Sequence, residues 1–269
     1  MTSLDSSFEP AKYATPANLK MSEAYETFFA NIGIVSQFRT VAEMGIPLAK
    51  SQYTKFMSEF MDEMKPGQPL SSILVDPESF FQSGQSEAFK TRAIEQVLNN
   101  AAEVSRSVVL LLAHSVFEEF IHQCLEISVL CDPYLFKSEI EKKKESIKNV
   151  LNEDPDEIYQ RRLKEHISNL MRESLPANCE MLNNLIRKQE FIFRHPTYIF
   201  SVDKIKALDA LRQEIVHRAK FLGPITDLDG KINYFVITAL YFIMLFHNRF
   251  GVVLIPDKKL REQLASSKQ

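Results

Sequence analysis

Apolar residues recur at intervals of three and four positions through most of the chain. This period predicts helices at residues 20–50, 51–64, 84–130, 178–190 and 202–222, and a last helix from Asp227 or Asp229 to about Arg249. The charged section 137–172 predicts two further, exposed helices. No stretch alternates convincingly with a period of two residues, which would indicate strands. We therefore expect an all-α fold, a helical bundle.

Three prolines and a glycine interrupt the helical pattern in KPGQPLSSILVDPES, residues 65–79. We expect this joint to divide an N-terminal helical appendage, residues 20–79 with the joint, from a main domain at 80–256. The polar residues 1–19 are expected to form a flexible N-terminus, and residues 257–269 a polar tail.

Composition narrows the class of protein. Of 269 residues, 45% are hydrophobic, which is enough to bury a sizeable core. The formal net charge of −3 gives no global attraction to nucleic acid or membrane, so such binding needs a local patch. Seven glycines are few, which argues against glycine-rich phosphate loops and all-β architectures. Cys124, Cys131 and Cys179 form no C-x-x-C pair and indicate free thiols.

The expected location is the cytoplasm. The start, MTSLDSSFEPAKY, has neither the basic nor the apolar region of a secretion signal. The most apolar run, residues 234–246, is shorter than the roughly 20 residues that span a bilayer, so we expect a buried helix and no membrane insertion.

One stretch, ALDALRQEIVHRAKF at 207–221, carries two residues that helical amphipathicity does not explain. Arg212 falls inside the edge of the apolar stripe, where its guanidinium needs an anion, a polar network or an opening to solvent. A stem packed on the core with its head in water would also satisfy it. His217 lies about 140° further around the helix, as a surface histidine would, unless two copies share one groove.

This stretch resembles the signature helix of the HEPN superfamily, whose motif is arginine, four residues, then histidine, usually with a polar residue directly after the arginine. Arg212, Gln213 and His217 match it, although Asn, Asp or His is commoner at the Gln213 position. SVVLLLAHSVFEEFIHQCLE resembles the family's long upstream helix, and INYFVITALYFIMLF its following apolar helix. The resemblance covers roughly residues 84–252.

The resemblance implies a metal-independent endoribonuclease that works as a homodimer and needs no cofactor. His217 would act as general base or acid for attack of the ribose 2′-hydroxyl, Arg212 would stabilise charge on the phosphoryl oxygens, and Gln213 would orient phosphate or ribose. A toxin-like or anti-phage role follows, with an antitoxin or regulatory protein as a possible partner. The alternative is a non-catalytic HEPN module that dimerises or binds a nucleotide or partner, with the helices of residues 20–64 as a docking element.

A third hypothesis is a helical metalloprotein, because His114, Glu118 and His122 recur at four-residue intervals. The set spans about 12 Å, too far for all three side chains to reach one ion. We expect instead that Glu118, or its neighbour Glu119, pairs with Arg212.

Two basic groups are candidates for holding RNA phosphates. Arg187, Lys188 and Arg194 lie near the signature helix in sequence and are a second choice for substrate contacts. The denser groups in the charged section alternate with acidic residues, which favours a solvated helix face; they are Lys142, Lys143, Lys144, Lys148, Arg161, Arg162 and Lys164.

Overall fold

The computed structural model describes residues 15–63, 87–141, 154–188, 191–193, 195, 198–218, 225–255, 258–259 and 261–262. These residues form α2 (Pro16–Glu63), α4 (Glu87–Cys131), α5 (Lys137–Glu141), α7 (Pro155–Leu170), α8 (Leu175–Ile186), α9 (Val202–Arg218) and α10 (Leu228–Phe250). No strand occurs among them, so the expected all-α class is confirmed.

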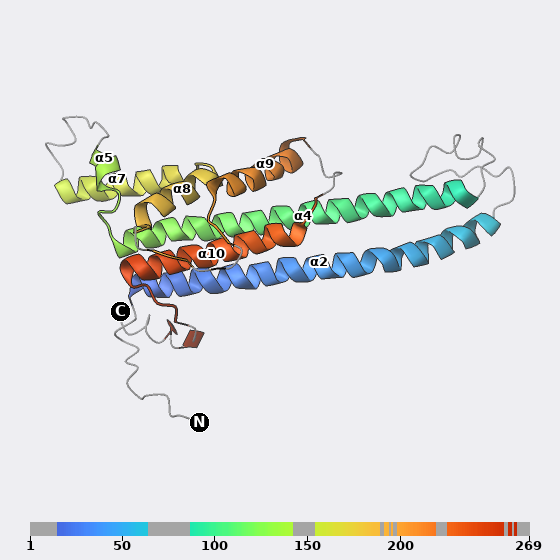
Figure 1. Cartoon of the computed structure of the whole chain (residues 1–269), viewed down its shortest axis with the longest axis horizontal. Coiled ribbons are helices and arrows are strands. Elements are labelled where there is room, and N and C mark those ends of the chain that lie inside the picture. The colour runs from blue at the N-terminus through green and yellow to red at the C-terminus, as the bar shows by residue number, and fades with distance from the viewer. Residues whose placement is uncertain are drawn as a thin grey trace, which may run out of the picture.

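The long helices α2 and α4 lie side by side and run in opposite directions (Figure 1). Both continue well beyond the shorter helices, which gather around the C-terminal half of α4 (Figure 1). Helix α10 packs along α4, and α8 and α9 contact α4 and each other. The C-terminal half of α4 therefore has α2, α8, α9 and α10 as neighbours, in agreement with the apolar central part of its sequence.

Helix α2 differs from the sequence prediction of two helices, because it continues without a break from residue 16 to residue 63. Pro47 lies inside it and cannot donate a backbone hydrogen bond to the preceding turn. Helix α4 lies along α2, and Ala102 of α4 lines the same hollow as Pro47.

The first half of α2 belongs to the main core. Met21, Phe28 and Val35 are buried in the same cluster as the central residues of α4 and α10. Residues of the predicted appendage and of the predicted main domain therefore share one core. The predicted joint at 65–79 lies outside the described residues.

Aromatic side chains join the three longest helices. Phe117 of α4 is fully buried, and its ring stacks on that of Phe235 of α10 with centroids 4.9 Å apart. The ring of Phe28 from α2 approaches Phe117 edge-on at 6.4 Å. Such pairs add to the free energy of burying the rings, so this trio is the centre of the core.

The chain after α10 returns to the beginning of α2. The backbone N–H of Val253 donates to Asn18 Oδ1 at 3.0 Å, and that of Ile255 donates to Ser22 Oγ at 2.8 Å. Arg261 is buried and bonded to Glu26, so this part of the predicted polar tail packs on α2. Residues 251–255 form no strand.

Two segments, Leu98–Cys131 and Leu228–Phe250, are long and apolar enough to cross a membrane by length and composition alone. Half of each most apolar window is buried inside the fold, as core helices also are. Neither observation decides where the protein resides, and the cytoplasmic location stays a prediction.

Replacing Phe117 with alanine tests the aromatic trio. We expect Phe117→Ala to lower the free energy of unfolding by about 3–5 kcal/mol, because it leaves a cavity between three helices. Chemical denaturation followed by circular dichroism measures the loss. Leu112→Ala is the control, since Leu112 is an exposed residue of the same helix and its loss should cost under about 1 kcal/mol. Equal losses in the two variants would contradict this account of the core.

Candidate functional site

The start of α9 is fixed from two sides. The Ser201 hydroxyl accepts a hydrogen bond from the Lys204 backbone N–H at 3.4 Å, as an N-cap side chain does. The Tyr234 hydroxyl of α10 accepts from the Ser201 N–H at 3.0 Å and donates to the Ser201 carbonyl at 3.1 Å. The direction of α9 is therefore set by α10 as well as by its own cap.

The faces of α9 separate as its sequence predicts. Ile205, Leu208 and Ile215 are buried and form the apolar stripe. The motif residues Arg212 and Gln213 are half-buried, while His217 is exposed. Arg212 thus lies at the edge of the core with part of its side chain in solvent.

A buried histidine connects α9 to α4. His114 of α4 is 1% exposed, and its Nε2 lies 3.1 Å from Oδ1 of Asp209 on α9. Because the carboxylate can only accept, Nε2 is the protonated nitrogen of the neutral ring. The other ring nitrogen, Nδ1, is 4.0 Å from a Glu118 oxygen and has no hydrogen-bond partner in the part of the chain described.

Burial lowers the pKa of His114 below its ordinary 6.5, because desolvation penalises the charged imidazolium. The carboxylates of Glu118 and Asp209 oppose this shift, while the positive charge of Arg212 adds to it. Arg212 is therefore near enough to act on the imidazole. The four charged or titratable groups form one electrostatic cluster at the α4–α9 contact.

Four residues of α9 form what we call the α9 polar edge: Asp209, Arg212, Gln213 and His217. Asp209, Gln213 and His217 follow one another at four-residue intervals, so they lie along one face of the helix. Arg212 follows Asp209 by three residues and borders the same face. The edge extends from Asp209, at its buried contact with His114, to the exposed imidazole of His217. The guanidinium of Arg212 and the amide of Gln213 lie between these two ends.

The expected pairing of Arg212 with Glu118 or Glu119 is absent among the described residues. Glu118 faces His114 instead, and Glu119 Oε1 accepts a hydrogen bond from the Gln123 side chain at 3.0 Å. The polar contact observed between α4 and α9 is therefore His114 with Asp209, and not the expected pair of an α4 glutamate with Arg212.

The hypothetical metal ligands do not gather into a site. In the described ranges, no three His, Cys, Asp or Glu side chains are placed to hold one ion. His114 is engaged with Asp209, and Nε2 of His122 is buried without a hydrogen-bond partner in the same ranges.

The second-choice substrate residues lie beyond the C-terminal end of α8. Arg187 is exposed, Lys188 is half-buried, and Arg194 lies outside the described residues. Arg187 borders a hollow of about 240 Å³ whose walls are mainly aromatic: Phe191, Phe193, Tyr198, Phe200 and Tyr241. Stacked rings beside one cation are suited to unpaired bases, although these rings also pack on one another.

Within the charged section, Arg161 and Arg162 of α7 are half-buried and Lys164 is exposed. The four lysines between residues 142 and 148 lie outside the described residues.

Comparison with known proteins gives no relative for this chain: no family model, no curated protein and no solved structure matches it. The candidate site therefore rests on its geometry. The sequence argument missed Asp209, although its position three residues before Arg212 and four before Gln213 was a usable signal.

The buried histidine should make stability depend on pH. Because the pKa of His114 is lowered in the folded state, its stabilisation is complete above the unfolded value of 6.5 and is lost as the pH falls from there through the lower pKa of the folded state. From pH 7 to 5 we expect urea denaturation to show a fall in unfolding free energy, by up to about 1.4 kcal/mol per pH unit. His114→Gln keeps a donor for Asp209 and does not titrate, so its profile should be flatter. If the unfolding free energies of the wild type and of His114→Gln change in parallel with pH, a buried neutral His114 is contradicted.

Proposed function

We propose that this protein is a HEPN-type endoribonuclease that cleaves RNA without a metal ion and acts as a homodimer. The observation that carries the proposal is the α9 polar edge. It presents Arg212, Gln213 and His217 in succession, with the first two half-buried and the imidazole exposed. An imidazole can transfer the protons of this cleavage, a guanidinium can stabilise the phosphate charge, and an amide can orient the substrate.

The proposed reaction begins with His217 taking the proton of a ribose 2′-hydroxyl. The 2′-oxygen attacks the adjacent phosphorus, and the bond from phosphorus to the 5′-oxygen of the next nucleotide breaks. A protonated imidazole supplies the proton that the leaving oxygen takes up. The products are a 2′,3′-cyclic phosphate and a free 5′-hydroxyl. Histidine suits both proton transfers because its ordinary pKa lies near neutral pH.

Arg212 would stabilise the negative charge that develops on the phosphoryl oxygens. Its guanidinium stays charged at any working pH and can bind two oxygens at once. Partial burial restrains its side chain, so less freedom is lost when phosphate binds. Gln213, which is also half-buried, would donate its amide N–H to the phosphate or ribose.

The proposal includes two copies because Arg212 and His217 are about 140° apart around one helix. In an isologous dimer, the arginine of one copy and the histidine of the other can line one groove. A toxin-like or anti-phage role, with an antitoxin or regulatory partner, belongs to the same proposal.

RNA cleavage in the presence of EDTA tests the proposal. We expect the purified protein to cut single-stranded or structured RNA and leave 2′,3′-cyclic phosphate ends, detected by resistance to phosphatase until acid opens the ring. His217→Ala should lower the rate by about 10²–10⁴-fold, as loss of a general base does. Arg212→Ala should lower it by about 10²–10³-fold through lost charge stabilisation.

The control is His247→Ala, which removes an exposed histidine of α10 whose Nδ1 lies 2.9 Å from the Val252 carbonyl oxygen, away from α9, and it should leave the cleavage rate unchanged. Circular dichroism verifies that each variant keeps its helices. Cleavage that persists in His217→Ala, or that requires a divalent ion, would contradict the proposed chemistry.

A further inference from the structure

The outer side of α2 carries a row of exposed residues that no described helix covers. We define the α2 outer row as Ile34, Phe38, Val41, Gly45 and Leu48. Val41 is 69% exposed, and Ile34 and Leu48 are each 61% exposed. Figure 1 shows α2 at one margin of the molecule, with α4 and α10 on one side of it only. Apolar rows of this extent on a protein surface mark interaction sites.

The spacing of the row fits a partner helix. Its members follow one another by four, three, four and three residues, which is the repeat of helices that pack along each other. The row covers about 21 Å of helix, at 1.5 Å per residue. The partner is therefore expected to be a helix of at least similar length.

Gly45 gives a second, independent indication. Glycine weakens a helix relative to alanine, and a side chain at this position would meet nothing within 4 Å. Gly33 of the same helix is equally open, so what distinguishes Gly45 is its place within the α2 outer row. A glycine in an interhelical row does allow another helix to approach closely.

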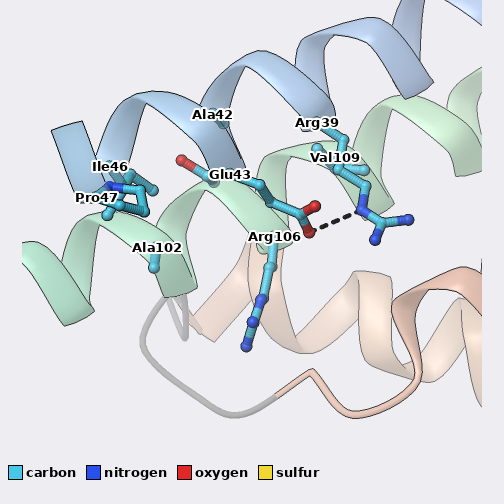
Figure 2. Close-up of a pocket in the computed structure, with 9 residues that line it drawn as sticks. Arg39, Ala42, Glu43, Ile46, Pro47, Ala102, Arg106 and Val109 are labelled. Carbon is cyan, nitrogen blue, oxygen red and sulfur yellow. Dashed lines mark hydrogen bonds and ion pairs between the residues drawn. The ribbon is translucent and has the colours of Figure 1, made fainter.

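The charges of this part of α2 lie away from the row. Between Glu26 and Lys50 the charged residues are Arg39 and Glu43. Both line a hollow of about 310 Å³ between α2 and α4 (Figure 2). Arg39 Nε donates to Glu43 Oε1 at 2.9 Å, and its Nη2 donates to Asp229 at 2.9 Å. The outer row therefore carries no charge of its own.

We propose that the α2 outer row binds the same row of a second copy of this chain. An uncharged face meets itself without like-charge repulsion, whereas a charged partner would find no complementary group there. The row is also self-complementary in shape. When two copies pair in opposite directions about a point between Val41 and Ala42, Phe38 of each copy faces the gap at Gly45 of the other. This contact does not depend on the proposed ribonuclease activity.

Filling the gap at Gly45 tests the contact. Gly45→Leu improves helix propensity, and the added Cβ meets no atom within 4 Å in the described part of the chain, so misfolding is not the expected cause of a loss of assembly. We expect light scattering after gel filtration to show that Gly45→Leu has a lower mass than the wild-type assembly: that of a monomer, or that of a dimer where two α9 polar edges also meet. The dissociation constant from sedimentation should rise at least tenfold.

Ser36→Leu is the control, because it adds the same side chain at an exposed position of α2 that points away from the row. It should keep the wild-type mass, while Val41→Glu should lower the mass as Gly45→Leu does. RNA cleavage, measured in parallel, reports separately on the α9 polar edge. A monomeric wild-type protein would overturn the proposal. A monomer that binds phosphatidylcholine vesicles through the α2 outer row would overturn it too, because the row would then bind lipid and not a second copy. An unchanged mass in Gly45→Leu would overturn it as well.

Discussion

The stacking of Phe117 on Phe235 is the interaction on which the rest of the structure depends, because it fixes α4 against α10 at the centre of the core. Phe28 adds the third long helix to the same point. His114 precedes Phe117 by three residues on α4, and its ring meets the edge of the same Phe235 at 5.9 Å. The packing that stabilises the core therefore also positions a polar side chain at the α4–α9 contact.

That buried imidazole sets where α9 can lie. A polar ring excluded from water costs free energy unless it is hydrogen-bonded, and Asp209 supplies the acceptor. Once Asp209 is bound, the positions of Gln213 and His217 follow from the helical repeat. The exposed imidazole is thus placed by a chain of contacts that begins in the apolar core, although it touches none of that core itself.

The sequence predicted the helices well where apolar periodicity was strong, as in α4, α9 and α10. It failed where it divided α2 into helices at 20–50 and 51–64, because local periodicity does not show that α2 continues along α4 as one helix. The direct pairing of Glu118 with Arg212 was wrong for a similar reason. The acid that faces a given base across two helices depends on how the helices are rotated and shifted relative to each other. The apolar periodicity of α4 or of α9 does not contain that information.

The two proposed surfaces belong to different elements. The α9 polar edge lies at the α4–α9 contact, and the outer row lies on α2 at the margin of the bundle (Figure 1). The most direct test of the central claim is histidine NMR during titration with an RNA oligonucleotide whose 2′-hydroxyls are methylated and cannot react. The account predicts that the His217 ring resonances shift on binding, while those of His247 stay in place. Binding that leaves His217 unperturbed would contradict it.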